Sequence, residues 1–123
     1  MKAYWIDRET NMAKIVETNG KLDQLYRMCH CDCIDIAVRY IDGIPLNFVV
    51  DDEGLLKEDA MFSVFDVHGE PQLAGSVVVF ACDAEDDDLS GLGGTEIEAL
   101  VNHTVMTLMT DLTSRTILVV DEF

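Results

Sequence analysis

Basic residues are nearly absent from the second half of this chain. Between Glu58 and Phe123 the sequence has fourteen acidic residues and a single basic one, Arg115, and the chain of 123 residues carries a formal net charge of −16. A surface so poor in Lys and Arg repels the phosphates of nucleic acids and of anionic membranes. We therefore expect no direct binding to nucleic acid or membrane, which leaves a basic protein surface, cations or plain solubility as explanations of the charge.

Long hydrophobic runs are also missing. Residues 1–7 are interrupted by charge too early for the apolar core of a signal peptide, and no run approaches the roughly 20 residues of a membrane span. The four cysteines make a poor disulfide framework, because Cys29, Cys31 and Cys33 crowd one segment and only Cys82 lies elsewhere. These features predict a cytoplasmic protein with free thiols.

The motifs of the common enzyme classes do not occur. The sequence has no Gly-x-Ser-x-Gly nucleophile turn, no glycine-rich phosphate loop and no His-Glu-x-x-His zinc helix. His103 is better explained as a surface or boundary residue than as a general base. The sequence therefore predicts a protein that is not an enzyme and that uses no cofactor.

What the chain does contain is enough apolar material for one core. Hydrophobic residues make up 49% of it, which at this length fits one domain over residues 1–123. Alternating apolar residues predict hairpins over residues 2–17 and 34–50, with Asp42-Gly43 as a type I′ turn in the second. The apolar run at 76–81 and the segment 116–120 each predict a central strand.

Two helices are expected beside these strands. Apolar residues at helical spacing predict a short helix near 21–28. A longer apolar stripe predicts one long amphipathic helix near 95–112, with Thr95 as its N-cap and Glu98 completing a capping box. Residues 58–66 fit neither template, and we assign them to a short helix or an irregular loop. Hairpins and two helices without regular βαβ alternation predict an α+β fold with a largely antiparallel or mixed sheet.

Four segments share a pattern with a known family. They are Met1-Lys2-Ala3, the expected helix at 22–26, the stretch Val49-Val50-Asp51-Asp52-Glu53-Gly54-Leu55-Leu56-Lys57 and the stretch Leu73-Ala74-Gly75-Ser76-Val77-Val78-Val79. Together they resemble the domain of unknown function 3846, over roughly residues 1–82. The resemblance implies an origin in phages, mobile elements or bacterial genomes and brings no catalytic residues. It divides the chain into a family-like part, an acidic loop at 83–94 and a C-terminal helix and strand at 95–123.

The densest acidic run follows the expected central strand. Its carboxylates are the candidate partner-binding residues, because they attract a basic surface over a distance. Two of them, with Ser90, also match the first oxygen ligands of a calcium loop, although Ile97 stands where such a loop needs a bidentate Glu. The partner-binding candidates are Asp83, Glu85, Asp86, Asp87 and Asp88, and the metal candidates among them are Asp86 and Asp88.

The segment Cys29-His30-Cys31-Asp32-Cys33 is the other candidate site. Zn²⁺ and Cu⁺ favour thiolate and imidazole ligands, so Cys29, Cys31 and Cys33 are candidate metal ligands. On an extended strand the alternation puts the three sulfurs on one side, so that a fourth ligand has to come from a distant residue. Buried thiols that pack as small hydrophobic groups explain the same pattern.

Three functions stay open at this point. The first is a non-enzymatic acidic interaction protein of phage or mobile-element type, which binds a basic protein surface. The second is a DNA-mimic inhibitor, whose carboxylates replace phosphates in the basic groove of a nucleic-acid-binding host protein. The third is a metal- or thiol-dependent module at Cys29–Cys33. The sequence does not separate a monomer from an oligomer.

Overall fold

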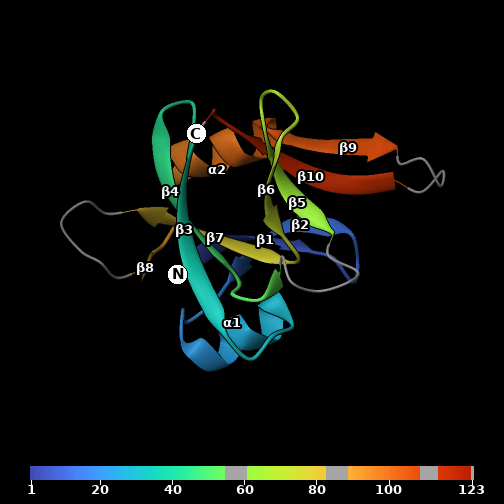
Figure 1. Ribbon diagram of the computed structural model, residues 1–123. Helices are drawn as coiled ribbons and strands as arrows, with labels where there is room; N and C mark the ends of the chain where they lie inside the picture. Colours follow the sequence, from blue (N-terminus) through green and yellow to red (C-terminus); the bar gives the residue numbers. More distant parts are fainter. Residues whose placement is uncertain (55–60, 83–88, 109–113, 123) are drawn as a thin grey trace.

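The computed structural model describes residues 1–54, 61–82, 89–108 and 114–122. These residues form two β-sheets with two short helices (Figure 1). In chain order the elements are β1 (Lys2–Asp7), β2 (Met12–Glu17), α1 (Leu22–Cys29), β3 (Ile34–Ile41), β4 (Ile44–Asp51), β5 (Phe62–Asp66), β6 (Pro71–Ala74), β7 (Val77–Cys82), β8 (Leu89–Ser90), α2 (Gly94–Asn102), β9 (Thr104–Leu108) and β10 (Ser114–Val120). The predicted α+β class is confirmed.

The first sheet has the strand order β2-β1-β7-β4-β3, with β8 paired to β7, and every pair in it is antiparallel. Its central strand is β7, where Val77–Ala81 are all buried, as the apolar run predicted. The β3–β4 hairpin turns at Asp42 (φ 52°) and Gly43 (φ 78°). Both residues have the positive φ of the predicted type I′ turn.

The second sheet has the order β6-β5-β10-β9 and is mixed. β10 runs parallel to β5 and antiparallel to β9, which confirms the expected central strand near the end of the chain. β5 corrects the assignment of residues 58–66 to a helix or loop, of which 58–60 lie outside the described residues. A register shift between Phe62 and Val64 interrupts the alternation of this strand, so a period of two is not visible in the sequence.

The predicted long helix is wrong. α2 has only nine residues, Gly94–Asn102, and the chain turns at His103 into β9. β9 contains Thr104, Val105 and Thr107, whose β-branched side chains favour a strand. The apolar stripe therefore belongs to two elements in succession, and the rest of the expected helix, 109–112, lies outside the described residues.

The expected cap of this helix is wrong as well. The N-cap residue of α2 is Gly93, and no side-chain hydrogen bond caps the helix. At the other end, Thr104 Oγ1 donates to the carbonyl of Leu100 at 2.8 Å and lies 2.7 Å from the hydroxyl of Tyr4 in β1. The helix therefore ends where Thr104 joins its last turn to the neighbouring sheet.

The core lies between the two sheets. Tyr4, Phe48 and Val79 of the first sheet pack in one buried cluster with Leu118 of the second sheet and with Leu100 of α2. On the opposite face of the first sheet, α1 covers a smaller cluster, which confirms the predicted short helix (Figure 1). The smaller cluster consists of Ala3, Leu25, Cys29, Val49, Val78 and Phe80.

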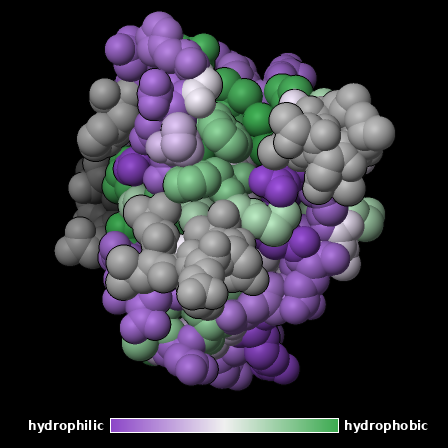
Figure 2. Space-filling model, turned by 45° about the vertical axis from the view of Figure 1, so that its right-hand side comes forward, coloured by the Kyte–Doolittle hydropathy of each residue, from purple (hydrophilic) through white to green (hydrophobic). Residues whose placement is uncertain are grey.

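The surface is unevenly polar. Figure 2 shows one face on which hydrophobic residues gather near the middle and hydrophilic residues cover the upper and lower parts. Several large apolar side chains are exposed in the described chain, among them Ile36, Val67 and Met106. In the parts of the chain that the structure describes, no helix has the length and apolar character needed to cross a membrane.

Candidate interaction site

Five carboxylates meet at the corner where β4 ends and β3 begins. The two strands pair there in register, with Ile34 opposite Asp51, and the backbone N–H of Asp52 donates to the carbonyl of Cys33 at 3.0 Å. This pairing brings together acidic residues from around the start of β3 and around the end of β4, which the hairpin separates along the chain. We call the group the acidic corner; it consists of Asp32, Asp35, Asp51, Asp52 and Glu53.

Two surface hollows adjoin the acidic corner and share Asp51 in their linings. The first has a volume of about 410 Å³ and lies beside the turn that follows α1. It is lined by His30, Cys31, Asp32, Cys33, Asp51 and Glu53. The hollow is therefore mostly polar and carries negative charge on two sides.

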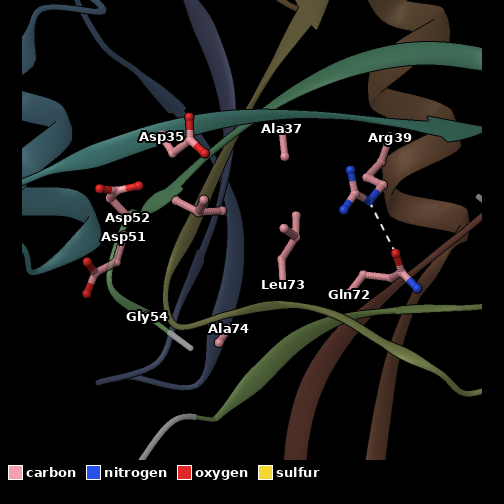
Figure 3. A pocket seen from close by; sticks show the side chains of 10 residues that line it. Asp35, Ala37, Arg39, Asp51, Asp52, Gly54, Gln72, Leu73 and Ala74 are labelled. Carbon is pink, nitrogen blue, oxygen red and sulfur yellow. Dashed lines mark hydrogen bonds between the residues drawn. The ribbon is translucent and has the colours of Figure 1, made fainter. Parts of the chain in front are cut away.

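The second hollow, of about 230 Å³, lies between β3 and β6, the outer strands of the two sheets (Figure 3). Asp35, Asp51 and Asp52 stand at one end of it. At the other end, Arg39 Nε donates to Gln72 Oε1 at 3.3 Å. Apolar side chains lie between these ends, so the carboxylates and the guanidinium are held apart.

Few opposite charges neutralise the acidic corner among the described residues. Within the described part of the chain, no ion pair involves Asp32, Asp35, Asp52 or Glu53. Backbone groups orient two of the carboxylates, since Asp35 Oδ1 accepts the N–H of Ile36 and Asp51 Oδ1 accepts the N–H of Glu53, both at 2.9 Å. Like charges gathered in one region of a surface attract cations and cationic side chains.

The cysteine segment does not have the predicted extended form. α1 ends at Cys29, and His30 then adopts a left-handed conformation (φ 54°, ψ 46°) that turns the chain. Cys29 is buried while Cys33 is exposed, so the sulfur atoms do not share one side. No disulfide joins any of the four cysteines, all of which lie in the described residues.

Cys29 packs as a small hydrophobic group. Its Sγ contacts the carbonyl oxygen of Val49 at 3.5 Å within the cluster under α1. Burial is the main cause that raises the pKa of this thiol to about 12, and electrostatic interactions with Cys31 and Asp51 add to it. A thiol with so high a pKa is neutral at physiological pH and is a poor nucleophile or metal ligand.

The other metal and partner candidates are not among the residues that the structure describes. Among the residues it describes, no three His, Cys, Asp or Glu side chains are grouped so that they can hold a metal ion. Asp83, Glu85, Asp86, Asp87 and Asp88 all lie outside the described residues. The residues on either side of that run, Cys82 and Leu89, pair with each other across β7 and β8.

A buried carboxylate next to the first hollow was not predicted. Asp7 is 4% exposed, and its Oδ1 lies 2.9 Å from Nε2 of His30. The N–H of Glu9 and the hydroxyl of Thr10 donate to the same carboxylate, each at 3.1 Å. Burial acts to raise the pKa of Asp7, but the hydrogen bond from His30 and the two others outweigh it, so the pKa is lowered.

Comparisons with protein-family models, with curated proteins and with solved structures find no match to this chain. The resemblance stated above therefore stays a prediction. The acidic corner itself was not singled out by the sequence, because its five residues lie in two short runs whose charge is moderate in each. Only the pairing of β3 with β4 concentrates them.

Proposed function

We propose that this chain is a non-enzymatic interaction protein, of the phage or mobile-element type that its resemblance implies, and that it binds a basic protein surface through the acidic corner. One observation carries the proposal: four of the five carboxylates, Asp32, Asp35, Asp52 and Glu53, form no ion pair within the described residues. A cationic partner supplies the counter-charges that these groups lack among the described residues.

The physical basis is long-range attraction followed by contact. A net charge of −16 raises the rate at which basic proteins encounter this one. At the corner the carboxylates converge from two chain segments that paired strands hold in place, so little ordering is needed when a partner binds. Binding of this kind weakens as salt rises, since exposed charges are screened over about 8 Å at physiological ionic strength.

A matched pair of variants tests the proposal. The corner variant carries Asp32→Asn, Asp35→Asn, Asp52→Asn and Glu53→Gln, and leaves Asp51 to hold its turn. The control variant carries amides at four other acidic positions, Glu17, Glu70, Glu96 and Glu98. Both lose four negative charges, from clustered positions in the corner variant and from dispersed positions in the control. The control also loses the ion pair of Glu17 with the amino terminus, 3.4 Å away.

Each immobilised protein is exposed to nuclease-treated bacterial lysate and eluted with steps of salt. We expect the wild type and the control variant to retain the same basic proteins and to release them as salt rises, and the corner variant to lose them. If the retained proteins bind nucleic acid and added DNA displaces them, the DNA-mimic mode applies. Equal retention by both variants would contradict the proposal.

A further inference from the structure

β3 is the outermost strand of the first sheet, and one of its edges has no strand beside it in the described chain. Its eight residues, Ile34–Ile41, all pair with β4 on the other edge. In an antiparallel ladder successive residues point their backbone groups alternately toward the partner strand and away from it. Because a two-residue turn follows Ile41, this residue forms a hydrogen-bonded pair with β4. The backbone N–H and C=O groups of Tyr40, Val38 and Ile36 therefore point away from β4.

Three of these outward groups already have partners. The N–H of Asp121 donates to the carbonyl of Tyr40 at 2.7 Å, so the chain that follows β10 covers the end of β3 next to the turn. Side chains of β3 itself bond the other two. Arg39 Nη1 donates to the carbonyl of Val38, and the N–H of Ile36 donates to Asp35 Oδ1, both at 2.9 Å. The outward N–H groups of Val38 and Tyr40 and the outward carbonyl of Ile36 have no hydrogen-bond partner in the described chain. Such caps protect an edge strand from uncontrolled pairing but leave it open to a segment that replaces them.

One side-chain face of the same strand is apolar and exposed. Ile36, Val38 and Tyr40 are 46%, 37% and 44% exposed, and they lie on one face because side chains alternate along a strand. Ile36 also lines a groove of about 440 Å³ together with Leu22 and Leu25 of α1. Met1 and Leu89 also line this groove, so it extends over the α1 face of the sheet rather than along the free edge of β3.

Negative charge lies at both ends of β3. The acidic corner is at its start. At its end, the side chain of Asp42 is 62% exposed, and the carboxylate of Asp121 accepts the N–H groups of Asp42 and Gly43 at 3.1 and 2.9 Å. At roughly 3.3 Å per residue, these two groups of charge are ~26 Å apart.

We propose that β3 is a docking strand, to which a partner protein adds an extended segment of alternating β-branched apolar residues and Lys or Arg. Its apolar side chains pack on Ile36, Val38 and Tyr40, and its basic side chains face Asp35 and the acidic ends. A basic side chain that binds Asp35 releases the N–H of Ile36 for the new backbone ladder. The inference rests on the proposed function and specifies the form of its partner.

The charges also show why the occupant is not a second copy of this chain. Antiparallel pairing of two β3 strands brings the acidic corner of each copy to the Asp42 end of the other. Like charges directly opposite each other destabilise a strand pair. A segment with basic residues instead places opposite charges next to the acidic ends of β3, and these attract each other.

A defined probe tests the docking strand on the full chain. The probe is a fluorescent peptide of about nine residues, the length of an ordinary strand, in which Val and Lys alternate. Its controls are a peptide of the same composition in scrambled order and one with Glu in place of Lys. We expect the alternating peptide to bind at least tenfold more tightly than either control.

Two protein variants carry the same added charge at different places. Ile36→Lys puts a positive charge on the docking face, whereas Val67→Lys puts it at a residue that is 58% exposed in the turn after β5. We expect Ile36→Lys to weaken binding of the alternating peptide about tenfold, as for loss of a central interface anchor, and Val67→Lys to change it little. Methylating the peptide nitrogens of either the valines or the lysines tests the backbone ladder, and one of the two sets should abolish binding.

The outcomes separate this inference from the proposed function. If the alternating and scrambled peptides bind equally and lose affinity with salt, the acidic surface stands and the docking strand is overturned. The docking strand is also overturned if both methylated peptides bind normally, or if sedimentation shows a dimer that Ile36→Lys dissociates. If neither Lys-containing peptide binds at low salt, the proposed function is contradicted as well.

Discussion

At the scale of single residues, Asp7 is a buried carboxylate that several parts of the fold hold in place. It lies 4% exposed at the end of β1, and the imidazole of His30 reaches it from the end of α1 at 2.9 Å. Ser76, just before β7, contacts the same oxygen at 3.4 Å. One buried carboxylate thus ties together a strand, a helix end and the start of the central strand.

The lowered pKa of Asp7 makes this contact dependent on pH. A group whose pKa is lower in the folded state stabilises the fold above its unfolded pKa, and loses that contribution as the pH falls through the folded value. We expect Asp7→Asn to lower the free energy of unfolding at pH 7 by about 1–3 kcal/mol, the usual cost of disturbing a buried charged hydrogen bond. Urea unfolding followed by the fluorescence of Trp5, the single tryptophan, measures it.

The pH profile gives the control. Below about pH 4, where Asp7 of the unfolded chain begins to bind a proton while the folded carboxylate stays ionised, the difference between Asp7→Asn and wild type should begin to shrink. Glu9→Gln removes a neighbouring carboxylate whose side chain is 72% exposed, and it should have little effect at any pH. A difference for Asp7→Asn that stays constant from neutral to acid pH would contradict this account.

At the scale of elements, local turn chemistry was the most reliable guide. The β3–β4 hairpin was predicted correctly because Asp42 and Gly43 have the conformational freedom that a type I′ turn needs. α2 and β9 were merged into one helix because apolar residues recur through both. The contact between Thr104 and Tyr4, which lies at the junction of α2 and β9, joins residues 100 positions apart and leaves no signal in a local window.

Gly43 provides a test of the hairpin that involves conformation alone. Its φ is +78°, and an added Cβ would meet no atom within 4 Å. We therefore expect Gly43→Ala to destabilise the protein by about 1–2 kcal/mol, the cost of a left-handed conformation for an L-residue. Thermal unfolding followed by circular dichroism measures the change.

Gly94 is the matched control for this substitution. It is the first residue of α2, an added Cβ there also meets no atom within 4 Å, and its φ is outside the left-handed region. Gly94→Ala should leave stability unchanged or raise it by about 0.5 kcal/mol, because alanine loses less entropy on folding. Equal losses at Gly43 and Gly94 would show that the positive φ is not the cause.

At the scale of the whole molecule, the net charge of −16 sets how the protein responds to salt. Surplus charge of one sign repels itself more in the compact state than in the unfolded chain. We expect the unfolding temperature to rise by several degrees between about 0.01 and 0.15 M NaCl, as screening shortens the range of the repulsion. Differential scanning calorimetry measures this rise.

The corner variant described above serves as its control. Because it removes four charges that lie close together, it should be more stable than wild type at low salt and should respond less to added salt. The variant with four dispersed amides should show a smaller gain. A stability that is flat or falls with salt in the wild type would mean that the repulsion is already balanced within the fold.

The sequence by itself determined the features that depend on neighbouring residues: the type I′ hairpin, the apolar strands β7 and β10, the short helix α1 and the excess of acidic charge. Tertiary structure alone decided where α2 stops, which carboxylates form the acidic corner and which imidazole binds Asp7. The physical reason is the distance along the chain over which each effect acts. Turn conformations and side-chain alternation are set within a few residues, whereas burial, strand pairing and electrostatic grouping depend on which distant segments the fold places side by side.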